Sequence, residues 1–148
     1  MTERSESHGN HFRLAYYVAS DGPRLVLFGP QDAPIPLLLG MMKSCEAERT
    51  FVKLEELPFI RAIGGVRLSL ECRESIRVGE VTRDHNNSND TPHFAWRCTL
   101  QDLDDAIYFL EGMLNCSTPC HQYLSGYIGS DATLVVSIGE YTDDIFES

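Results

Sequence analysis

TLQDLDDAIYFLEGMLN, at residues 99–115, carries the strongest secondary-structure signal in the chain. Thr99 and Asp102 form a capping-box-like start, in which each side chain accepts a hydrogen bond from the other residue's backbone amide. Apolar residues then recur with the period of an α-helix, at Leu103, Ala106, Ile107, Leu110, Met113 and Leu114. The sequence therefore predicts a helix over residues 100–115 with one face in the core.

The opposite side of this predicted helix is polar and mostly acidic. It carries Asp104, Tyr108, Glu111 and Asn115. Asp104 and Glu111 are seven residues apart, which places them two turns along the same face. We therefore expect a solvent-facing acidic stripe on the helix.

Apolar stretches elsewhere in the chain predict strands. They cover residues 11–19, 24–29, 50–55, 59–63, 66–72, 93–98 and 133–138. The last stretch is rich in β-branched residues, so we expect it to be a buried, central strand. A second helix is predicted over residues 33–47 with Asp32 as its cap. Gly64 and Gly65 supply the positive φ angles of a tight hairpin between two of the strands.

This order of elements, with helices interspersed among hairpins, is typical of an α+β fold. The length of 148 residues suits one domain. We expect a single α+β domain over residues 11–148, formed by one mostly antiparallel sheet with two helices packed on a face. Residues 1–10 are polar and lack the apolar segment of a secretory signal, so we expect a disordered N-terminal tail and a cytoplasmic protein.

The negative charge of the chain is concentrated in its last third. The formal net charge is −10, and residues 98–148 hold nine acidic residues and no Lys or Arg. Such a segment repels phosphate backbones, which argues against binding to nucleic acid. The most apolar run of the whole chain, residues 34–42, is too short to cross a bilayer, so we expect no membrane partner. The asymmetry predicts a face that attracts a basic partner or a cation.

Five cysteines, an odd number, fit reduced thiols in a cytoplasm. Cys116, Cys120 and His121 fall in the segment CSTPCH, which could supply three zinc ligands but lacks the usual C-x-x-C pair. No catalytic motif is present, neither a nucleophile elbow nor a phosphate-binding glycine-rich loop. The sequence thus predicts no cofactor, no catalytic residue and no metal ligand, and buried thiols with a hydrogen-bonded histidine are favoured.

The C-terminal part contains HQYL at residues 121–124, followed by the pattern V-x-S-x-G-E-Y at residues 135–141. This pattern resembles the ending of a group of small uncharacterised bacterial proteins. The resemblance implies a bacterial, cytoplasmic, single-domain protein and no particular activity. It also suggests that His121 and Glu140 touch, which we expect to be a structural pair.

Three functions fit these observations. We favour a non-enzymatic acidic binding module of the immunity or inhibitor kind, which docks a basic protein through the acidic helix face and the C-terminal tail. Its predicted partner-binding residues are Asp104, Tyr108, Glu111, Glu140, Tyr141, Asp143 and Asp144. The first alternative is a metal-binding protein or metal-dependent enzyme that uses His121 and the C-terminal carboxylates. The second is a structural subunit that forms homo-oligomers.

Overall fold

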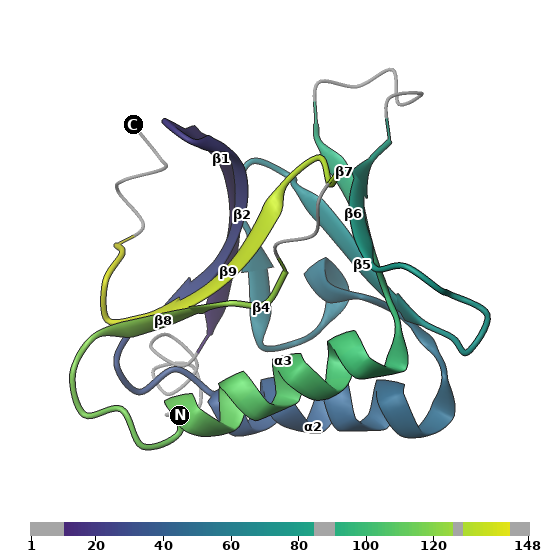
Figure 1. Ribbon diagram of the computed structural model, residues 1–148. Helices are drawn as coiled ribbons and strands as arrows, with labels where there is room; N and C mark the ends of the chain where they lie inside the picture. The colour runs from purple at the N-terminus through teal and green to yellow at the C-terminus, as the bar shows by residue number, and fades with distance from the viewer. Residues whose placement is uncertain (1–10, 85–90, 126–128, 143–148) are drawn as a thin grey trace.

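The computed structural model describes residues 11–84, 91–125 and 129–142 of the chain. It confirms the predicted single α+β domain (Figure 1). The predicted N-terminal tail, residues 1–10, lies outside the described residues.

The strands form two sheets. Sheet A has the order β4 (Ile60–Ala62), β1 (Phe12–Ala19), β2 (Gly22–Gly29), β9 (Thr133–Ile138) and β8 (Cys120–Tyr123). Sheet B has the order β3 (Phe51–Lys53), β5 (Arg67–Cys72), β7 (His93–Cys98) and β6 (Glu80–Arg83). The helices are α2 (Ile35–Glu48), α3 (Leu100–Met113) and the short 3₁₀-helix η1 (Leu54–Glu56).

The prediction of one mostly antiparallel sheet is corrected, because both sheets are mixed. β1 pairs with β4, β2 with β9 and β5 with β7 in parallel. Gly64 and Gly65 have the expected positive φ angles of 68° and 74°, but they do not close a hairpin. They turn the chain from β4 in sheet A to β5 in sheet B. Local sequence shows that the chain turns here, but it does not show which strands pair afterwards.

Each long helix connects the two sheets. α2 follows β2 of sheet A and leads to β3 of sheet B, while α3 follows β7 of sheet B and leads to β8 of sheet A. Figure 1 shows the two helices side by side across one end of the sheets. Their apolar faces join the inner faces of both sheets in one core, whose fully buried members include Leu27, Leu38, Met42, Leu68, Trp96, Leu103 and Leu110. Burial of each such side chain contributes about 1.5–3 kcal/mol, so the helices are held firmly over the sheets.

The helices differ from their predictions only at the ends. α3 has the predicted capping box, with both hydrogen bonds between Thr99 and Asp102 at 3.0 Å. The helix ends at Met113, so Leu114 was wrongly placed on the buried face and is 48% exposed. In α2, Pro34 takes the cap position in place of Asp32, and the helix starts at Ile35. β9 is an interior, buried strand, as expected.

Candidate functional site

The predicted acidic residues of α3 lie together on its exposed face. Asp104, Tyr108 and Glu111 are all exposed, and Tyr108 is 72% exposed. This side of α3 borders α2, because the Glu111 carboxylate lies 3.2 Å from the ammonium group of Lys43. The stripe expected from sequence is therefore one side of a junction between two helices.

A second contact across this junction joins two groups of the same charge. The carboxyl group of Glu46 on α2 lies at the Asp104 carboxyl group on α3, and a hydrogen bond between them, together with the negative charge of Asp104, raises the pKa of Glu46. Partial burial raises this pKa further, while the positive charge of Arg49 acts in the opposite direction. Ionised together, the two carboxylates repel each other, and the fold keeps this repulsion on its surface.

We call Lys43, Glu46, Asp104, Tyr108 and Glu111 the helix seam. It presents three carboxyl groups and one ammonium group around an exposed phenol ring. The Lys43–Glu111 pair is about half exposed on both sides, so it contributes at most about 1 kcal/mol and can exchange with other ions. The seam can therefore accept a cationic group through its carboxylates and through the face of the Tyr108 ring.

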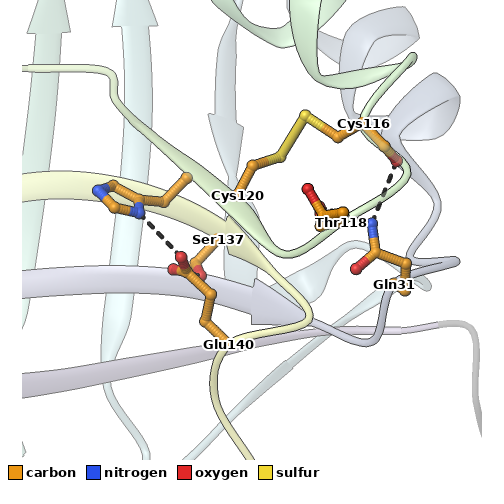
Figure 2. The surroundings of a disulfide bond; sticks show 7 residues. Gln31, Cys116, Thr118, Cys120, Ser137 and Glu140 are labelled. Atoms are coloured by element: carbon orange, nitrogen blue, oxygen red, sulfur yellow. Dashed lines mark hydrogen bonds and ion pairs between the residues drawn. A yellow bond between two sulfur atoms is a disulfide. The ribbon is translucent and has the colours of Figure 1, made fainter.

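Glu140, predicted as a partner-binding residue, follows β9 on sheet A and is bound within the protein. One carboxylate oxygen accepts a hydrogen bond from Ser137 Oγ at 2.5 Å, and the other lies 3.1 Å from His121 Nδ1 (Figure 2). The predicted contact of His121 with Glu140 is thus confirmed. Partial burial opposes ionisation of Glu140, but these two contacts outweigh it and lower the pKa of the carboxyl group.

Tyr141, the next predicted residue, also makes contacts within the fold. Its hydroxyl lies 3.3 Å from that of Tyr17, and its ring packs 5.6 Å from Phe28 on sheet A. The hydrogen bond with Tyr17, helped by partial burial, raises the pKa of Tyr141 to about 12. Asp143 and Asp144 lie outside the described residues. The structure thus brings three of the predicted residues together on α3 and places two others on sheet A.

The expectation that all five cysteines are reduced is wrong for two of them. Cys116 and Cys120 form a disulfide, while Cys45, Cys72 and Cys98 are buried outside any disulfide. Burial raises the pKa of the Cys45 and Cys72 thiols, which keeps them protonated. The disulfide uses the two sulfurs that the zinc hypothesis needed. Over residues 11–84, 91–125 and 129–142, no group of three or more His, Cys, Asp or Glu side chains is placed to hold a metal ion.

The disulfide closes a short loop between the end of α3 and the start of β8. Gln31, from the connection between β2 and α2, donates hydrogen bonds from Nε2 to the carbonyl oxygens of Cys116 at 3.1 Å and Thr118 at 3.0 Å (Figure 2). Gly139 lies against Gln31 and Pro119 with a φ of 76°, so a side chain there would be strained and crowded. The loop thus ties the end of α3 to the start of α2 and to sheet A.

Sequence reasoning missed Lys43, Glu46, Gln31 and Ser137. Glu46 and Lys43 lie three residues apart on a predicted helix, but only the packing of α2 against α3 brings them to Asp104 and Glu111. Ser137 had a local signal, because it precedes Glu140 by three residues across the turn at Gly139.

Comparison with protein-family models, curated proteins and solved structures finds no match for this chain. None of the described helices is both long and apolar enough to span a membrane.

Removal of the disulfide should destabilise the fold. For the short loop that it closes, restricted freedom of the unfolded chain corresponds to about 2 kcal/mol. We therefore expect the Cys116→Ser, Cys120→Ser double variant to unfold at lower urea concentration than the oxidised wild type. Reductant should lower the midpoint of the wild type to a similar value and leave the variant unchanged. Equal midpoints for the oxidised and reduced wild type would contradict this stabilising role.

Glu140 should make stability depend on pH in the acid range. Its pKa is lower in the native state than in the unfolded chain, so the unfolded state binds more protons and stability is lost as the pH falls through the native pKa. Glu140→Gln should flatten this part of the stability profile, measured by urea unfolding across the acid range. The control Glu48→Gln removes an exposed carboxylate with no hydrogen-bond partner among the described residues, and its profile should keep the wild-type slope.

Proposed function

We propose that this protein is a non-enzymatic binding module that docks a basic protein through the helix seam. The observation that carries the proposal is the contact of the Glu46 and Asp104 carboxyl groups beside the exposed Tyr108 ring. A cation from a partner would relieve the repulsion between the two carboxylates. The free protein bears a cost that disappears in the complex, which favours association.

The chemistry of the seam suits an arginine or lysine side chain. A guanidinium group can form charge-assisted hydrogen bonds to the Asp104 and Glu46 carboxylates. The same cation can lie over the Tyr108 ring, a contact worth about 0.5–1 kcal/mol at an exposed site. Tyr108 also offers a large contact area with few rotatable bonds, as tyrosines of recognition surfaces do. These features support a basic protein surface as the partner.

The charge distribution of the whole chain supports the same partner. Arg97 is the last basic residue, and α3 begins the acid-only segment that follows it. The field of such a segment speeds encounter with a basic protein and weakens as salt is added. A module of the immunity or inhibitor kind would use this field to find a basic functional surface and cover it.

Within this proposal, the seam makes the central contact, and the C-terminal residues differ in role. Glu140 and Tyr141 use their polar atoms within sheet A, so we assign them to the supporting structure. Asp143 and Asp144 follow Tyr141 in the sequence and add negative charge for the same partner.

Charge reversal tests the proposal directly. The double variant Asp104→Lys, Glu111→Lys should bind an arginine-rich peptide at least roughly tenfold more weakly than the wild type at low salt. The matched control, Glu48→Lys with Glu56→Lys, makes the same charge change on exposed residues outside the seam and should retain most of the affinity. NMR shift mapping should place the peptide over α2 and α3. Equal weakening by both double variants would leave only a general charge effect and contradict the seam as the docking site.

Neutralising Asp104 should stabilise the free protein while weakening partner binding. Because the native pKa of Glu46 is raised, the wild type loses stability as the pH rises through that pKa. Asp104→Asn should flatten this loss and raise the free energy of unfolding at neutral pH by a few tenths of a kcal/mol. Asp105→Asn, a control on a neighbouring exposed position of α3, should change neither property. Lower stability of Asp104→Asn in urea unfolding at neutral pH would show that the two carboxyl groups do not repel.

A further inference from the structure

Sheet B carries a cavity on the face opposite the core. Its volume is about 310 Å³, at the lower end of the range for small-molecule sites. Residues from all four strands of the sheet line it, and so do residues just beyond the strand ends. The cavity therefore belongs to the rigid part of the fold.

The strand register explains why the surface is hollow here. Lys53, Ser69, Ala95 and Thr82 lie side by side in one row across the four strands. Three of these side chains are short, so the row forms a floor. The next row on one side holds Phe51, Glu71, Arg97 and Glu80, and the next row on the other side places Arg67 beside His93. From these rows, Phe51, Arg67 and His93 line the cavity and form walls around the floor.

The cationic side chains of the cavity have fewer ion-pair partners than Arg97 in the neighbouring row. Arg97 is paired with Glu71 at 3.5 Å and with Glu80 at 3.7 Å. Arg67 and Lys53 face the cavity, and Arg67 has no ion-pair partner among the residues that the structure describes. Lys53 has only a 4.0 Å contact with Glu56. Two cationic groups are thus available to a ligand.

Arg83 also borders the cavity on β6, but its side chain points to the other face of sheet B, because it follows Thr82 of the floor and pairs with the buried Phe94. Its guanidinium lies 5.4 Å from the centre of the Tyr16 ring and 5.6 Å from that of Phe94. It also donates a hydrogen bond to the Tyr16 hydroxyl at 3.4 Å. The Arg83 guanidinium is therefore held on the core side of the sheet and does not contribute a cation to the cavity.

Two carboxyl-bearing residues, Glu55 and Asp84, also line the cavity. Glu55 Oε1 accepts a hydrogen bond from the Leu68 amide at 2.9 Å and so serves the backbone of β5. Lys53 and Arg67 are thus the two cationic side chains of the cavity, and Glu55 is already engaged by the backbone.

We propose that this cavity binds a small organic anion, with its carboxylate or phosphate group between Arg67 and Lys53 and a flat apolar part against Phe51. Phe51 is 53% exposed at the cavity wall, where a planar ring can cover it. The site lies on sheet B and is distinct from the helix seam, so it does not depend on the docking function proposed above.

Titration of the whole protein with phenyl phosphate and, separately, benzoate tests the site. NMR shifts should saturate and centre on β3, β5 and β7. The probe that binds more tightly identifies the anionic group, and benzylamine, a cationic ring of similar size, should not bind there. Absence of saturable shifts at the cavity with both anions at roughly 10 mM would overturn the proposal.

Arg67→Ala should weaken binding of the better anion about five- to tenfold, the loss expected for one charge-assisted hydrogen bond. The matched control is Arg77→Ala, which removes the same charge from an exposed position that does not line the cavity. Both variants should unfold at the wild-type urea midpoint, since neither arginine has an ion-pair partner in the described ranges. Equal loss of affinity in the two variants would reduce the effect to net charge and reject a specific site.

Discussion

Burial of the apolar faces of α2 and α3 in the core between the two sheets is the interaction on which the other features depend. Each helix spans from one sheet to the other, so neither sheet can shift without uncovering leucines such as Leu38 or Leu110. The same packing sets the two helices side by side and brings Glu46 against Asp104. The energy of core burial is many times larger than the repulsion of two carboxylates near the surface, so the fold can hold an unfavourable contact there.

Fixed ends keep this arrangement in place along α3. At its start, the capping box satisfies backbone amides that a helix otherwise leaves unpaired. At its end, the disulfide loop and the hydrogen bonds from Gln31 join α3 to β8 and to the start of α2. Tyr108 lies between these two anchors. The exposed Tyr108 ring therefore stands on a helix that is fixed at both ends. A ring on a rigid helix loses less conformational freedom on binding than a ring on a loop.

The sequence predicted the features that depend on neighbours along the chain. The capping box, the buried stripe of α3 and the interior position of β9 follow from spacing and residue type alone. The contact of His121 with Glu140 was expected from a sequence pattern and not from spacing. What failed depends on distant pairing: Gly64 and Gly65 turn the chain as expected, but β4 then pairs with β1 across more than 40 residues. For the same reason, the sequence predicted only the α3 residues of the seam, which recur with the spacing of one helix face. Glu46 was missed because it comes from another helix.

Net charge is a poor guide to this surface, because the fold separates the charges by element. The acid-only segment supplies α3, whereas Lys53 and Arg67 come from the nearly neutral first part of the chain and lie on the outer face of sheet B. Strand pairing brings these two cations together, and the ion pairs of Arg97 neutralise the adjoining row. The net charge of −10 for the whole chain therefore describes neither surface. The ligands proposed for the acidic seam and for the cavity at Arg67 and Lys53 have opposite charge, and each site can be occupied without the other.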